Sequence, residues 1–105
     1  MEVKKLIEEL KENLNEQIPR RIRKIVLYGS YARNTQNGDS DIDILLIVKD
    51  EVEPELRDLI YGICYDLNSK YDVWIDVSLL SENDLETVRG KQPFVQNAML
   101  DGIVI

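Results

Sequence analysis

Two aspartates, Asp41 and Asp43, stand two residues apart at the start of an aliphatic stretch that runs to Val48. If this stretch is a β-strand, both carboxylates project from the same face of the sheet. Two negative charges this close repel each other and favour protonation of one carboxylate unless a cation offsets them. Magnesium suits the pair, because it takes oxygen ligands and commonly uses one or two carboxylates together with substrate phosphates. The pair therefore indicates a magnesium site, with a solvated surface pair as the alternative.

A third carboxylate, Asp76, lies between Ile75 and Val77 in another predicted strand. If that strand pairs beside the first, all three aspartates share one face of the sheet and could hold two divalent ions. Two ions held in this way stabilise both the attacking and the leaving oxygen in phosphoryl or nucleotidyl transfer. The alternative is an exposed aspartate on an edge strand.

Gly29 and Ser30 follow a predicted strand and precede a short predicted helix. Glycine lets the backbone approach a ligand closely, and the free N–H groups at a helix start attract phosphate. Ser30 adds a hydroxyl donor. We expect a phosphate-binding turn here, although an ordinary strand-ending turn would have the same two residues.

The sequence contains no histidine and a single cysteine, Cys64. The lack of histidine excludes Ser-His-Asp and Cys-His catalysis and histidine-ligated zinc. A single cysteine excludes an internal disulfide, and we expect Cys64 to be a small buried hydrophobic residue. The chemistry must therefore rest on carboxylates, hydroxyls, amines and a hard metal ion.

The net charge of −7 argues against bulk binding to nucleic acid, which depends on phosphate neutralisation by Lys and Arg. A short basic cluster at residues 20–24 is either a solvated turn and strand edge or a contact surface for an acidic partner. Apolar runs fall short of the ~20 residues of a membrane span, and the first residues are not a signal peptide. We expect a cytoplasmic protein that does not contact membrane.

The elements that position these residues follow from hydrophobic spacing along the chain. Apolar residues at helical spacing predict one helix from Val3 that Pro19 ends, and a second over about 54–70. Aliphatic runs and alternations predict three strands, at residues 22–28, 42–48 and 73–79, and residues 34–39 form a loop.

Three sequence signals predict the structure of the chain from Ser81 onward. Ser81 begins a capping box that opens a short helix, Pro93 begins another that Gly102 closes, and residues 103–105 add an edge strand. We expect one domain over residues 1–105, of α/β or α+β class, with helices covering one face of a small mixed sheet.

One spacing resembles a known family. Gly29-Ser30, ten intervening residues and Asp41-Ile42-Asp43 resemble the Gly-Ser-x10-Asp-x-Asp signature of the DNA polymerase beta-like nucleotidyltransferases. A chance match of these four positions in such a chain is on the order of one in a thousand. The length and the Tyr-Ala-Arg at residues 31–33 are most similar to the minimal nucleotidyltransferases (MNT), which act as antitoxins beside HEPN-domain toxins. The resemblance implies a polymerase beta-like fold over nearly the whole chain.

The resemblance also implies a role for each residue of the motif. Gly29 and Ser30 would hold the triphosphate of ATP, Asp41 and Asp43 would ligate Mg²⁺, and Asp76 would complete a two-ion catalytic site near the attacking hydroxyl.

Arg33 and Ser40 are grouped by the same resemblance with the nucleotide-binding residues. A surface salt bridge is the alternative for Arg33, because Asn34 stands where the family often has glycine. Asparagine also accepts left-handed geometry, so the loop is expected to be intact.

The reaction implied by the resemblance is transfer of AMP from ATP to a tyrosine hydroxyl of a partner HEPN toxin, with diphosphate released. A chain of this size offers little surface for a second substrate, which favours an acceptor protein that brings its own. Two alternatives stay open. One is transfer to a small molecule or RNA end with a partner chain supplying the acceptor site, and the other is a non-catalytic toxin-binding module. Three close carboxylates favour catalysis, since a pure binder does not need them.

Overall fold

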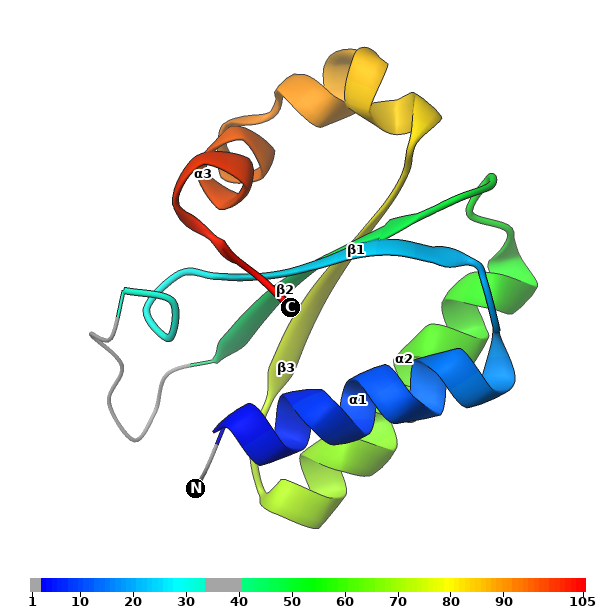
Figure 1. Cartoon of the computed structure of the whole chain (residues 1–105), viewed down its shortest axis with the longest axis vertical. Helices are drawn as coiled ribbons and strands as arrows, with labels where there is room; N and C mark the ends of the chain where they lie inside the picture. Colours follow the sequence, from blue (N-terminus) through cyan, green and yellow to red (C-terminus); the bar gives the residue numbers. More distant parts are fainter. Residues whose placement is uncertain (1–2, 34–40) are drawn as a thin grey trace.

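A computed structural model of the protein describes residues 3–33 and 41–105, which contain a four-stranded mixed sheet (Figure 1). The strands lie in the order β3-β2-β1-β4. Their bounds are β1 (Ile22–Tyr28), β2 (Ile42–Val48), β3 (Ile75–Ser81) and β4 (Ile103–Val104). β1 pairs antiparallel with both β2 and β4, while β2 and β3 run parallel. The predicted mixed α/β sheet is therefore confirmed, and β1 and β2 have their predicted bounds.

The third strand begins two residues later than predicted because Asn68 holds the turn before it. The backbone N–H of Val73 donates to the Asn68 carbonyl at 3.1 Å, and the N–H of Ile75 donates to the Asn68 side chain at 2.8 Å. At its other end β3 extends through Ser81, which pairs with Val48.

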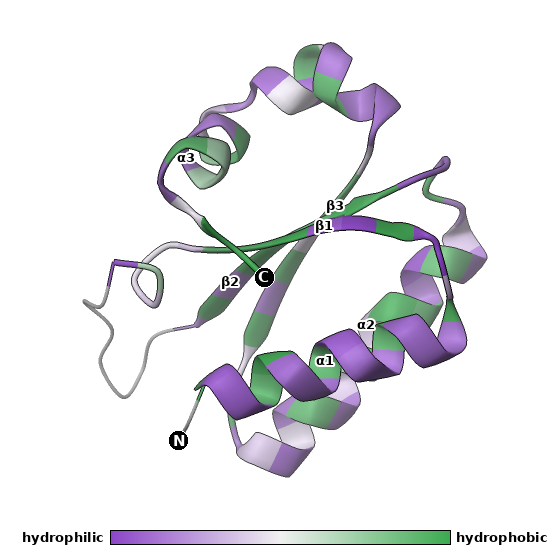
Figure 2. Cartoon of the chain, in the orientation of Figure 1, coloured by the Kyte–Doolittle hydropathy of each residue, from purple (hydrophilic) through white to green (hydrophobic). Residues whose placement is uncertain are grey.

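Two long helices, α1 (Val3–Gln17) and α2 (Pro54–Tyr71), pack against one face of the sheet (Figure 1). Their apolar stripes meet the inward residues of the strands in one continuous core, and hydrophobic and hydrophilic segments alternate along α1 (Figure 2). Glu9 of α1 accepts hydrogen bonds from Lys70 at 2.8 Å and from the Tyr71 hydroxyl at 2.9 Å, which joins the last turn of α2 to the middle of α1. Because parallel strands need a crossover, α2 is also the link that makes β2 and β3 parallel.

The opposite face of the sheet is covered by α3 (Pro93–Asp101), which follows two short 3-10 helices, η1 (Asn83–Glu86) and η2 (Val88–Lys91). A second, smaller core forms there from Val95 and Ala98 of α3 and from strand residues Val26, Leu45, Ile47 and Leu80. The expectation that helices cover one face thus holds for α1 and α2 only. Since the aliphatic strands bury both faces, α3 is needed on the second.

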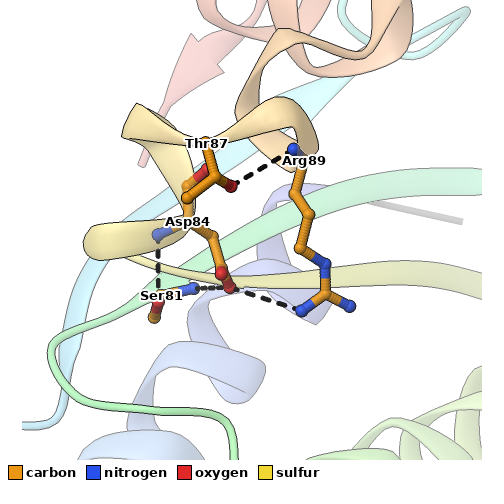
Figure 3. A network of polar contacts seen from close by, with 4 residues as sticks. All are labelled: Ser81, Asp84, Thr87 and Arg89. Atoms are coloured by element: carbon orange, nitrogen blue, oxygen red, sulfur yellow. Dashed lines mark hydrogen bonds and ion pairs between the residues drawn. The ribbon is translucent and has the colours of Figure 1, made fainter.

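A polar network connects the end of β3 to the segment that leads to α3 (Figure 3). The Ser81 N–H donates to the Asp84 carboxylate at 3.0 Å, and the Asp84 N–H donates to the Ser81 hydroxyl oxygen at 3.1 Å. Thr87 Oγ1 accepts from the Arg89 N–H at 3.2 Å, and Arg89 also lies 3.8 Å from the Asp84 carboxylate. The predicted capping box is confirmed, although the helix it opens is a single 3-10 turn.

Two residues of the basic cluster form ion pairs within the chain. Arg21 lies 3.5 Å from Glu53, and Arg23 lies 2.9 Å from Glu82. This favours the solvated strand edge over a contact surface for those two residues. In the part of the chain that the structure describes, no helix has the length and apolar character needed to cross a bilayer.

Candidate active site

The register of the sheet brings Asp43 and Asp76 together. Asp43 of β2 is the direct partner of Asp76 on β3 and of Tyr28 on β1. Residues paired in this way point to the same face of a sheet, so these three side chains lie on one face. That face is the one covered by α3, because Leu45 and Ile47, which alternate with Asp43, pack in the smaller core.

Electrostatics at this position favour a bound cation. Burial raises the pKa of the half-buried Asp43 carboxyl, and the negative charges of Asp76 and Asp41 raise that pKa further. Arg33 acts in the opposite direction but does not cancel the shift. The three aspartates therefore interact through space, and the site carries excess negative charge with oxygen donors only, which is the chemistry that Mg²⁺ fits.

The three aspartates do not by themselves form a complete metal-binding group among the described residues. Within residues 3–33 and 41–105, no three acidic, histidine or cysteine side chains stand close enough together to form a metal-binding group. Asp41 and Asp76 are exposed, while Asp43 is partly buried. The assignment of all three aspartates as metal ligands and catalytic residues stays a prediction.

Gly29 packs directly against the Asp43 carboxylate. Its φ is +73°, a conformation that residues with a Cβ rarely adopt. A Cβ added at this position would collide with Asp43 Oδ2 and lie 3.1 Å from Asp43 Cγ. The chain then turns, and the Arg33 N–H donates to the Gly29 carbonyl at 3.2 Å. Glycine is therefore required here both by backbone conformation and by the approach to Asp43.

A pocket of about 280 Å³ opens beside this glycine. Its lining combines the end of β1, the following turn and α3: Tyr28, Gly29, Ala32, Arg33, Phe94, Asn97 and Asp101. The rings of Tyr28 and Phe94 lie 6.4 Å apart at a tilt of 35°. The pocket thus places aromatic and polar side chains next to the predicted phosphate-binding turn.

Sequence reasoning missed the aromatic part of this site. Tyr28 alternates with Val26 on β1, and this spacing could have placed it on the same face as Asp43 once the pairing of β1 with β2 was assumed. Burial is the main reason that the pKa of the Tyr28 hydroxyl is raised, with Asp43 and Asp76 contributing, and a hydrogen bond with Ser78 acts against the rise. Phe94 and Asn97 lie about fifty residues beyond the motif, so no local signal pointed to them.

The remaining predicted site residues lie as follows. Ser30 is in the turn after β1, next to Gly29, and Arg33 lines the pocket and is exposed. Ser40 and Asn34 lie outside the described residues. The nucleotide-binding roles of Gly29, Ser30, Arg33 and Ser40 stay predictions.

Comparison with known proteins agrees with this geometry. Residues 3–104 match the family model described as nucleotidyltransferase domain. The proposed protein adenylyltransferase MJ0604 of Methanocaldococcus jannaschii is 33% identical over 105 residues, which is 100% of this chain and 99% of that protein. A second one from the same organism, MJ0141, is 31% identical over 75 residues, which is 71% of this chain and 76% of the relative.

Several solved structures with the same fold come from toxin-antitoxin complexes. One crystallised with AMP-PNP contains a chain that is 28% identical, with a TM-score of 0.63, covering 92% of this chain and 69% of that one. Another is the complex of a tri-AMPylated HEPN toxin of Shewanella oneidensis with MNT antitoxin. Its matching chain is 27% identical with a TM-score of 0.54, and the match covers 96% of this chain and 66% of that one.

The resemblance to the minimal nucleotidyltransferases is confirmed by these similarities. Nucleotidyltransferases generally use divalent metal ions, and the oxygen donors around Asp43 suit such an ion. The chain belongs to the nucleotidyltransferase domain family and is itself a nucleotidyltransferase.

Proposed function

We propose that this protein transfers AMP from ATP to a tyrosine hydroxyl of a HEPN-domain toxin and acts as the antitoxin of that pair. The observation that carries the proposal is the juxtaposition of Asp43, Asp76 and Gly29 on the face of the sheet that α3 leaves partly open. Relatives support the choice of acceptor, since two are proposed protein adenylyltransferases and one structural neighbour is bound to an AMPylated HEPN toxin.

The nucleotide would bind across the turn after β1. Gly29 keeps the backbone open beside Asp43, and Ser30 and Arg33 offer donors to the triphosphate. The pocket between Tyr28 and Phe94 is next to this turn and would take the nucleoside part of ATP. Its aromatic lining suits a flat base, because stacking on aromatic rings stabilises nucleobases.

Magnesium would be held by Asp43 with Asp41 and Asp76, where it would neutralise phosphate charge and polarise the reacting oxygens. Asp76 stands on the edge strand, on the side of Asp43 away from Gly29 and the pocket. An acceptor hydroxyl would therefore approach from β3. Its oxygen would bond to the α-phosphorus of ATP. The bond between that phosphorus and the oxygen bridging the α- and β-phosphates would break, and diphosphate and the phenolic proton would leave.

The position of the label in ATP tests this reaction. The protein is incubated with Mg²⁺, a HEPN-domain protein from the same organism, and ATP labelled on either the α- or the γ-phosphate. We expect the α label to appear on the HEPN protein, at a tyrosine mapped by peptide mass spectrometry, and the γ label to be released as diphosphate. Transfer of the γ label would show a kinase instead, and α label on RNA or on a small molecule would replace the protein acceptor.

A further inference from the structure

One glycine of the chain has no explanation inside the fold. Gly62 lies in the middle of α2, and an added Cβ would have nothing within 4 Å. At each of the other glycines in the described residues, Gly29, Gly90 and Gly102, the added Cβ would collide with atoms of the chain. Glycine inside a helix is destabilising relative to alanine. Gly62 therefore lowers the stability of α2 without a packing contact that requires it.

The surface around Gly62 is aromatic and exposed. Tyr61 and Tyr65 flank it on α2 with exposed fractions of 46% and 66%, and Trp74, the residue before β3, is 58% exposed. Aromatic side chains of this size are enriched at the centres of protein interfaces, where their burial contributes most of the binding energy. We name Tyr61, Gly62, Tyr65 and Trp74 the α2 surface.

The α2 surface is continuous with the active site. A depression of about 350 Å³ is lined by Tyr61, Tyr65 and Trp74 and also by Asp76. A second depression lies over Gly62 and has Tyr65 in common with the first. Because β3 is an edge strand, a molecule seated on α2 can reach Asp76 around that edge. The pocket beside Gly29 has no residue in common with either depression, so a nucleotide in that pocket and a molecule seated on α2 would occupy separate sites.

Charge indicates what kind of molecule fits. Asp58 and Asp66 stand one turn before and one turn after Gly62, and both are exposed on the rim of its depression. A cationic partner complements this rim. A missing Cβ between two tyrosines allows a backbone to approach α2 closely, and two helices pack most closely where one of them has its smallest residue.

We propose that the α2 surface docks a helix of the acceptor protein, with basic residues facing Asp58 and Asp66, and so delivers the acceptor hydroxyl to Asp76. The inference rests on the proposed function for the identity of the acceptor. It adds that acceptor selection depends on α2 and Trp74, away from the nucleotide pocket.

The substitution Gly62→Gln separates docking from folding. Glutamine is a good helix former, so the midpoint of thermal unfolding should stay the same or rise, but its side chain would fill the space over α2. We expect affinity for the same HEPN-domain protein, measured by calorimetry, to fall at least about tenfold, with ATP affinity unchanged. Trp74→Ala should have a similar effect. The matched control is Asn15→Gln on the exposed side of α1, which should change neither affinity.

The outcomes distinguish failure of the docking proposal from failure of the proposed function. Unchanged HEPN affinity in both Gly62→Gln and Trp74→Ala would overturn the docking proposal, and if AMP transfer then persisted the proposed function would stand. Weakened affinity in both variants supports docking, and if the wild-type protein also transferred no AMP only the catalytic proposal would fail. A wild-type chain that neither binds nor modifies the HEPN protein would overturn both.

Discussion

The two faces of the sheet are covered to different extents. On one face α1 and α2 seal a large core in which Leu6, Leu14, Ile44 and Ile60 have no measurable exposure. On the other face the nine-residue α3 covers only part of the strands. Asp43 and Asp76 lie in the part that it leaves open, and Tyr28 lies at the boundary, where its ring packs near Phe94 of α3. The same strand, β2, supplies both faces from alternate residues. The fold thus places the large core on one side of a strand and the proposed chemistry on the other, so substitutions one residue apart should have unrelated effects.

The largest effect on the open face is expected from Gly29→Val. The positive φ and the collision with Asp43 would strain the turn by about 1–3 kcal/mol and displace the carboxylate. We expect ATP binding to fall below detection in calorimetry. Gly62→Ala, a glycine substitution with no collision, is the control and should leave ATP affinity unchanged. Normal ATP affinity in Gly29→Val would show that the nucleotide does not bind at this turn.

A pair of leucine truncations tests the difference between the faces directly. Leu46→Ala would open a cavity in the large core and is expected to cost about 3–5 kcal/mol in the free energy of unfolding. Leu80→Ala, on the edge strand and in the smaller core, is expected to cost about 2–3 kcal/mol, because α3 can move to close the gap. Urea unfolding of both variants measures this. An equal or reversed order of the two losses would contradict the larger contribution of the core under α1 and α2.

A smaller effect is expected at the connection between the faces. Ser81→Ala removes the hydroxyl that accepts from the Asp84 N–H and should cost about 1 kcal/mol. Ser69→Ala, at an exposed position of α2, is the control and should leave the unfolding midpoint unchanged. If both serine variants unfold alike, the capping box does not stabilise the segment before α3.

The smallest effect is expected on the free energy of unfolding, when the negative charge of Asp43 is removed. Because the pKa of Asp43 is raised in the folded state, its ionised form destabilises the fold in metal-free buffer. Asp43→Asn should therefore unfold at a slightly higher urea concentration than the wild type at neutral pH. The difference should shrink as pH falls through the folded-state pKa towards the ordinary aspartate value, since the wild-type carboxyl then becomes neutral. A difference that grows on acidification would contradict the sign of the shift.

The local sequence pattern was sufficient to predict most of the helices and strands and to find the Gly-Ser and Asp-x-Asp motif. The aliphatic run from Ile42 to Val48 and the Gly29-Ser30 stop predicted the bounds of β2 and β1, and Pro54 marked the start of α2. The face on which α3 packs could not be predicted, because a short apolar stripe fits either side of a sheet whose strands are buried on both. The pocket of Tyr28, Phe94 and Asn97 joins segments distant in sequence, and only the tertiary structure brings them together.

Under the proposed function, the open face works by catalysis and not by contact alone. The most direct test is the double variant Asp41→Asn, Asp43→Asn, assayed for HEPN binding and for AMP transfer in the same preparation. Both substitutions keep side-chain volume and remove charge, so transfer should be lost while binding persists, and cells should no longer be protected from the toxin. If the double variant still modifies the HEPN protein, or protects cells as well as the wild type does, the carboxylates are not the basis of its function.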